Sequence, residues 1–179
     1  PVPGACTGVQ HKFYVNDNDN TGDVFTTAVG NDANSGSPAA PLRTLEAAYF
    51  KAVTGDTIFV DAGSFIFNAS YTLTKGITFL GANYTISPND PSDKEKINPA
   101  RNKETELIAL SFSAGVENIS FEGFTFDPGN RAAFTNTNPT SGNFRLLKNR
   151  FKINSALNQI HFIGSGTPGS TPAQIVGSG

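Results

Sequence analysis

The feature that most constrains this 179-residue chain is a short apolar pattern that recurs along it. The segments 119–126 (ISFEGFTF) and 144–151 (FRLLKNRF) both carry apolar residues at the first, third and eighth positions. The segment 77–84 (ITFLGANY) fits the same pattern, and Gly81 then aligns with Gly123. Each copy is too short to bury its own apolar face, so the copies must pack on one another.

Repeats of about 20–30 residues made of short strands are typical of a solenoid, whose coils stack around one core. The copies that begin at 77 and 119 are farther apart than those that begin at 119 and 144, which predicts an insertion. We expect the polar, proline-containing stretch at 87–103 to loop out of one coil. An antiparallel sandwich would also contain short strands separated by turns. It would not explain the recurrent frame, so the sequence favours a solenoid.

Glycine and proline punctuate the chain, with 18 and 11 residues, which favours many short strands over long helices. We expect residues 1–12 to form a polar tail and residues 13–179 to form one domain. Short apolar and β-branched stretches predict strands at 13–15, 24–29, 57–60, 66–67, 71–73, 77–80, 107–112, 119–126, 144–153 and 160–163.

One stretch, at about 43–54, has the periodicity of an amphipathic helix. Its apolar residues lie on one helical face, and they are Leu45, Ala48, Tyr49, Ala52 and Val53. Thr44 is the predicted N-cap and Gly55 the predicted stop signal. Because the first coil of a solenoid exposes an apolar end, we expect this helix to cap that end.

The segment at 30–65, GNDANSGSPAAPLRTLEAAYFKAVTGDTIFVDAGSF, resembles the N-terminal module of the pectate-lyase-like β-helix superfamily. The family pattern reads G-N-D-x-N-x-G-[ST], a proline, T-[IL]-x-x-A, and then G-D-T-I-x-V-x-x-G-x-[YF]. The matching residues are Gly30, Asn31, Asp32, Asn34, Gly36, Ser37, Pro41, Thr44, Leu45, Ala48, Gly55, Asp56, Thr57, Ile58, Val60, Gly63 and Phe65. The stretch 75–83 (KGITFLGAN) is similar to the first full coil of the same proteins.

The resemblance implies an all-β fold, a right-handed parallel β-helix with an N-terminal amphipathic capping helix. With YVND and TGDVFTTAVGNDANSG ahead of the helix, the chain is similar to large secreted surface proteins of Bacteroidota, many exported by the type IX route. This implies a secreted, extracellular or cell-surface location, and a chain that is the N-terminal part of a larger protein. In the same way we interpret Asn31, Asp32 and Asn34 as a structural turn before the helix.

Charge and cysteine content exclude several classes of partner. The formal net charge is −2 and no run of Lys or Arg could form a phosphate-binding stripe, so we expect no nucleic-acid partner. No apolar run approaches the roughly 18 residues needed to span a bilayer, so we expect no membrane insertion.

Cys6 is the single cysteine, which rules out a disulfide within the chain. The alternating charges at 93–106, Arg101 and Glu104 among them, are interpreted as a solvated loop.

An acidic loop is the best candidate site in the sequence. Asp17, Asp19, Thr21 and Asp23 place oxygen ligands at positions 1, 3, 5 and 7, the spacing of a calcium loop. Position 12 is Ala28, so the bidentate carboxylate of an EF-hand is missing. Two interpretations stay open: a low-affinity extracellular calcium site, and an Asx-rich turn whose side chains cap their own backbone.

Catalytic candidates are sparse. A glycoside hydrolase needs two carboxylates about 5–10 Å apart, and a lyase needs a base beside calcium-binding carboxylates. The acids within the predicted coils are Glu106, Glu117, Glu122 and Asp127, and the basic residues of the last coil are Arg145, Lys148, Arg150 and Lys152. We interpret the basic set as ordinary outward residues of a half-buried strand. His11 and His161 have no partner that the sequence identifies.

The sequence therefore assigns no catalytic residue and no cofactor other than calcium. Its favoured function is a secreted cell-surface module, structural or adhesive, whose partners are a polysaccharide or another surface or secretion protein. The alternative is the N-terminal portion of a polysaccharide lyase or glycoside hydrolase of the same superfamily.

Overall fold

The structure is a computed structural model, and it describes residues 10–66, 71–108, 112–114, 118–127, 134–135 and 144–152. Short strands and one short helix make up its regular elements. In chain order they are β1 (Lys12–Val15), α1 (Leu45–Lys51), β2 (Thr57–Val60), β3 (Gly63–Ile66), β4 (Tyr71–Leu73), β5 (Thr78–Gly81), β6 (Thr105–Ile108), β7 (Phe112–Ala114), β8 (Ile119–Glu122), β9 (Phe124–Asp127), β10 (Phe134–Thr135), β11 (Phe144–Leu147) and β12 (Arg150–Phe151).

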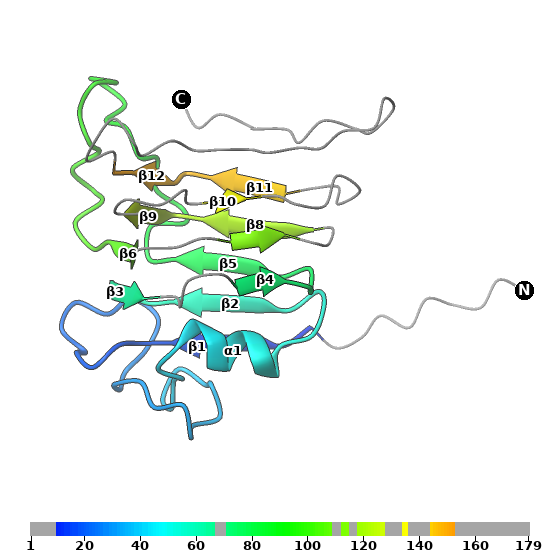
Figure 1. Ribbon diagram of the computed structural model, residues 1–179. Helices are drawn as coiled ribbons and strands as arrows, with labels where there is room; N and C mark the ends of the chain where they lie inside the picture. Colours follow the sequence, from blue (N-terminus) through cyan, green and yellow to red (C-terminus); the bar gives the residue numbers. More distant parts are fainter. Residues whose placement is uncertain are drawn as a thin grey trace, which may run out of the picture.

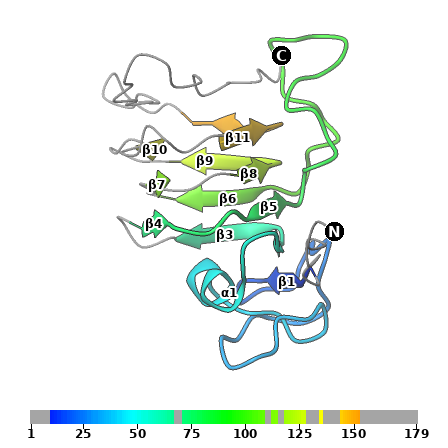
Figure 2. The same cartoon turned by 90° about the vertical axis from the view of Figure 1, so that its right-hand side faces the viewer.

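The strands form three sheets, and every strand pairing in them is parallel. The first sheet has the order β1-β2-β5-β8-β11, the second β12-β9-β6-β3 and the third β10-β7-β4. Consecutive strands such as β2, β3 and β4 enter different sheets, and β5–β7 and β8–β10 repeat this order; each such set is termed a rung. The rungs lie one above another in Figures 1 and 2, the solenoid-like arrangement that the repeat predicts.

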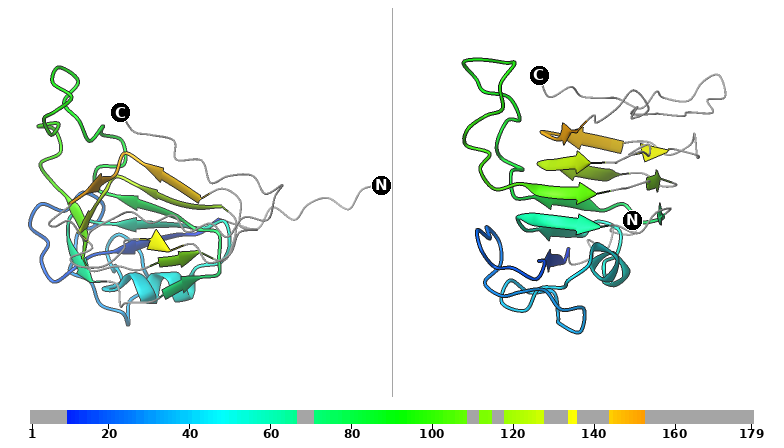
Figure 3. Two further views of the ribbon diagram at one scale, coloured as in Figure 1. Left: turned by 45° about the horizontal axis from the view of Figure 1, so that its top comes forward. Right: turned by 60° about the vertical axis from the view of Figure 1, so that its left-hand side comes forward.

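The predicted repeat is confirmed residue by residue in the first sheet. Phe144 pairs with Ile119, and Thr78 pairs with Ser120, as the alignment of the three copies requires. In the second sheet Thr105 pairs with Phe124. The chain from β6 to β9 is therefore much shorter than the chain from β5 to β8, so the extra residues lie between β5 and β6. This confirms the predicted insertion, which projects from one corner and rises alongside the upper rungs in Figures 1 and 3.

Columns of large side chains fill the space between the sheets. Phe79 and Phe121 stack at 4.5 Å between ring centroids with an interplanar angle of 3°, and both are fully buried. Phe126 stacks on Phe151 at 5.1 Å in the second sheet. Parallel pairing in one register brings equivalent side chains of successive rungs into contact, so each apolar column runs through several rungs.

Helix α1 lies beside β1 at one end of the stack (Figures 1 and 2), and it packs against β1 and β2. The Thr44 side chain accepts a hydrogen bond from the Ala47 amide, as predicted for the N-cap. The helix ends at Lys51, before the predicted residue 54, because other groups take over its last carbonyls. Lys75 Nζ donates hydrogen bonds to the Tyr49, Phe50 and Ala52 carbonyl oxygens.

Several strands begin or end at other residues than those predicted. The expected strand at 119–126 divides into β8 and β9 at Gly123, and the strand at 144–153 divides into β11 and β12, because the chain turns there from one sheet into the next. The strand expected at 107–112 belongs to β6 and β7, the one at 66–67 to β3, and β1 already begins at Lys12. The strand expected at 160–163 lies outside the described residues.

Within the described part, no helix has the length and apolarity to cross a membrane.

Candidate functional site

The acidic loop is built from successive turns in which side chains bind the backbone. Asp17 Oδ1 accepts from the Asp19 amide at 2.8 Å, and Asp19 Oδ1 accepts from the Thr21 amide at 2.9 Å. The hydrogen bonds from the Thr21 hydroxyl and amide lower the pKa of the exposed Asp19 carboxyl. These contacts are those of the Asx-rich turn that the sequence left open as one interpretation.

Asp23, the last residue of the predicted calcium set, turns toward the protein. Its Oδ2 accepts from Asn16 Nδ2 at 2.6 Å and from the Thr26 hydroxyl at 3.3 Å. Burial, followed by the charge of the neighbouring Asp61, raises the pKa of Asp23. Among the described residues, no group of three or more His, Cys, Asp or Glu side chains is arranged to hold a metal ion. The calcium site therefore stays a prediction.

Asp61, the residue after the predicted strand at 57–60, is the anchor of this loop. It is fully buried just after β2, and its carboxylate accepts from the Val24, Phe25 and Thr26 amides at 2.6–2.9 Å. The Thr26 hydroxyl donates a further bond at 2.8 Å. The prediction of a strand at 24–29 is wrong, because these amides bind a carboxylate instead of a neighbouring strand. A buried, unpaired aspartate would be unfavourable, so these bonds hold the loop on the stack.

A second polar cluster, termed the Glu104 network, joins the insertion to three rungs. The Arg101 side chain is fully buried, and its Nε and Nη2 donate to the two Glu104 carboxylate oxygens at 3.0 Å each. Glu104 also accepts from the Thr125 hydroxyl on β9 at 2.7 Å and from Arg150 Nη1 on β12 at 3.1 Å. Arg101 Nη1 donates to the Lys148 carbonyl at 2.8 Å, which ties the insertion to the corner before β12.

The electrostatics of Glu104 follow from these partners. Burial alone would raise the pKa of this carboxyl, but the hydrogen bonds from Arg101 and Thr125 and the charge of Arg101 outweigh it. The pKa of Glu104 therefore lies below its ordinary value, and the group is an anion at neutral pH. It is held as a structural ion and is unsuited to donate a proton as a general acid.

A third set of charges continues along the outer face of the second sheet. Lys152 Nζ forms ion pairs with Glu106 and, at 3.7 Å, with Asp127, both on earlier rungs. Parallel register accounts for the contact with Asp127, because Phe151 pairs with Phe126 and the residues that follow them, Lys152 and Asp127, are then lateral neighbours. Glu106 lies on the preceding rung, where it pairs with Thr125. The structure thus brings two of the acids considered as catalytic candidates together with a basic residue of the last rung.

The interpretation of the charges at 93–106 as a solvated loop is wrong for Arg101 and Glu104. Their partners Thr125 and Arg150 lie 21 and 46 residues from Glu104, so no local charge pattern could identify them. The turn interpretation of Asp32 is confirmed, because its carboxylate accepts from the Arg43 and Thr44 amides before α1. Glu117, His161, Cys6 and the end of the expected 66–67 strand lie outside the described residues.

In comparisons with protein-family models, with curated proteins and with solved structures, the chain has no match.

Proposed function

We propose that this chain forms a right-handed parallel β-helix of the pectate-lyase-like kind and serves as a secreted cell-surface module with a structural or adhesive role. The parallel sheets and their uniform register support the stacked-coil part of this proposal. Right-handedness agrees with the general rule that about 98% of crossovers between parallel strands of one sheet have this hand. The matching residues at 30–65 support the family.

The acids beside the second sheet are held in ion pairs and hydrogen bonds, and this observation supports the proposed function. Glu104 is bound by Arg101, Thr125 and Arg150, and Glu106 is paired with Lys152. A glycoside hydrolase needs one carboxyl that keeps a proton and another that is free to attack or to activate water. Carboxylates that bridge neighbouring rungs serve cohesion of the stack instead. Such a stack offers a long lateral surface for a polysaccharide or another surface protein.

The test is incubation with a panel of acidic and neutral polysaccharides, followed by two readouts. Ultraviolet absorbance detects the unsaturated products of a lyase, and a reducing-end assay detects hydrolysis. We expect neither signal to exceed that of a heat-unfolded sample. Retention of the folded chain on one of the immobilised polysaccharides would support an adhesive role toward that polysaccharide.

Turnover of any polysaccharide in the panel would contradict the proposal, provided that Asp127→Asn abolishes it. Asp127 lies at the end of β9 within 3.7 Å of Lys152 Nζ, so this substitution tests whether the turnover depends on an acid of this face. Such a result would favour the alternative function, a polysaccharide lyase or glycoside hydrolase.

A further inference from the structure

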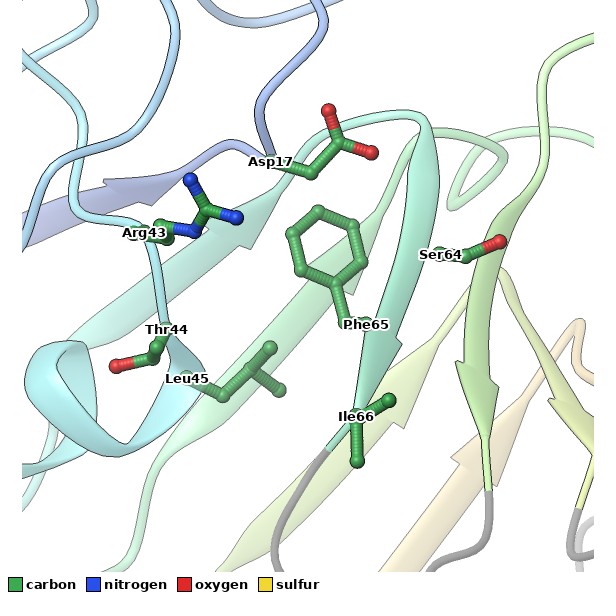
Figure 4. A pocket seen from close by; sticks show the side chains of 7 residues that line it. All are labelled: Asp17, Arg43, Thr44, Leu45, Ser64, Phe65 and Ile66. Carbon is green, nitrogen blue, oxygen red and sulfur yellow. The ribbon is translucent and has the colours of Figure 1, made fainter.

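A pocket of about 230 Å³ lies between the loop after β1, the start of α1 and the strand β3 (Figure 4). Its lining includes one cationic and one anionic side chain, Arg43 and Asp17, and an apolar surface made by Phe65 and Ile66. In Figure 4 the Arg43 guanidinium and the Asp17 carboxylate lie at the same side of the pocket, next to the Phe65 ring. Convergent polar groups over an apolar floor are characteristic of small-molecule sites.

The Asp17 carboxylate is fixed in place and keeps one oxygen available. Its Oδ1 accepts from the Asp19 amide, whereas its Oδ2 accepts no hydrogen bond from any residue that the structure describes. The carboxylate lies against the backbone of Gly63, where a Cβ atom would come within 2.3 Å of Oδ2. Gly63 has a φ of 141°, so both its backbone conformation and its missing side chain make room for this carboxylate. Asp17 is therefore pre-organised at the pocket.

Arg43 is available as well. Its backbone amide donates a hydrogen bond to Asp32 Oδ1 at 2.8 Å, which fixes the position of the Arg43 backbone. Its side chain is exposed. Within the described ranges, the guanidinium has neither an ion pair nor a hydrogen bond. Ile66, on the same pocket wall, is 69% exposed although it is a large apolar side chain. The pocket thus holds a cation, an anion and an apolar surface that are all unused.

We propose that this pocket binds a zwitterion, namely a free α-amino acid with an apolar side chain. Arg43 would bind the ligand carboxylate, Asp17 Oδ2 would accept from its ammonium group, and Phe65 and Ile66 would contact its side chain. A ligand that carries only a negative charge is attracted by Arg43 but repelled by Asp17, so a zwitterion fits both charges better. The volume equals that of about eight water molecules, which suits a ligand of about ten non-hydrogen atoms.

The test is titration of the protein with L-leucine, followed by ligand-observed NMR. For a ligand of this size in an open pocket we expect a dissociation constant on the order of 1 mM. N-acetyl-L-leucine lacks the ammonium charge and L-leucinamide lacks the carboxylate. We expect each analogue to bind at least about tenfold more weakly than L-leucine, because each loses one charged hydrogen bond.

Arg43→Gln and Asp17→Asn are expected to weaken L-leucine binding by about tenfold each. Asp17→Asn keeps the Oδ1 acceptor for the Asp19 amide, and the exposed side chain of Arg43 supports no other described residue, so both variants should keep the wild-type melting temperature. Arg145→Gln, an exposed arginine on β11, is the matched control and should leave affinity unchanged. The proposal is overturned if L-leucine shows no saturable binding. It is also overturned if N-acetyl-L-leucine or a uronic acid binds with the same affinity as L-leucine, or if the pocket variants keep wild-type affinity.

Discussion

Gly123→Ala is expected to lower the free energy of unfolding by about 4 kcal/mol or more. Gly123 forms the corner between β8 and β9 with a φ of 80°. A Cβ atom there would lie 2.2 Å from the Tyr84 backbone nitrogen and 2.4 Å from the Asn83 carbonyl carbon. Both atoms belong to the chain that leaves β5, so the clash cannot be relieved by rotating a side chain. Thermal and urea unfolding measure the change.

The matched control is Gly22→Ala. Gly22 also has a positive φ, 88°, but its nearest neighbour to a Cβ atom is the Lys103 side-chain carbon at 4.0 Å. Its substitution should therefore cost only the strain of the left-handed backbone conformation, about 1–2 kcal/mol. Equal losses for the two variants would show that rungs do not approach closely at Gly123, which would contradict the packing described above.

Glu104→Gln is expected to lower the free energy of unfolding by about 3 kcal/mol at neutral pH. The substitution leaves the fully buried Arg101 guanidinium without its counter-ion. Breaking a buried ion pair typically costs about 3–5 kcal/mol, and Glu104 is 24% exposed, which places the expected loss at the lower end. Unfolding by urea at pH 7 measures it.

The loss should depend on pH in a defined direction. Because the pKa of Glu104 is lowered in the folded protein, its stabilising contribution is present above the ordinary glutamate value of 4.5 and is lost as the pH falls through the folded value. The wild type and Glu104→Gln should therefore converge in stability in acid. Glu106→Gln is the control, because its partner Lys152 is 41% exposed and the expected loss is below about 1 kcal/mol. A gap between wild type and Glu104→Gln that is the same at all pH values would contradict the ion-pair account.

The sequence could predict the stack because its signal is periodic. The alignment of Ile119 with Phe144 reproduces the observed register, since equivalent core positions recur once per rung. Strand boundaries were harder to predict, because apolar residues on both sides of a corner look like one continuous strand. Gly123 is a local signal for such a corner, whereas Lys148, which turns the next rung with a φ of 54°, gives none.

The polar clusters could be predicted only where their contacts are local. Thr44 directly precedes α1, so its capping role could be predicted, and Asp32 was predicted to lie in the turn before the helix. Asp61 binds amides 35–37 residues earlier, and its role follows from the fold alone. The pocket has the same origin, because Asp17 and Arg43 meet β3 only once the first rung has formed. Contacts between rungs are set by the lengths of the insertion and turns, which no short motif encodes.

Equivalent residues of successive rungs are lateral neighbours on parallel strands, and cysteine pairs in a Cys6→Ser background test this arrangement. Thr78 pairs with Ser120 and Leu80 pairs with Glu122 on the same sheet face. Neighbouring strands are about 4.8 Å apart, which lies within the Cα separation that a disulfide allows. Moving one partner to the next position on the same face brings this separation to about 8 Å, which is too long.

Oxidation followed by mass measurement is the decisive experiment. We expect the pairs Thr78→Cys with Ser120→Cys and Leu80→Cys with Glu122→Cys to form disulfides in the folded protein. We expect the crossed pairs, Thr78→Cys with Glu122→Cys and Leu80→Cys with Ser120→Cys, to stay reduced. Antiparallel strands would give the opposite result, with the crossed pairs oxidised and the in-register pairs reduced. That outcome would contradict the stacked parallel rungs.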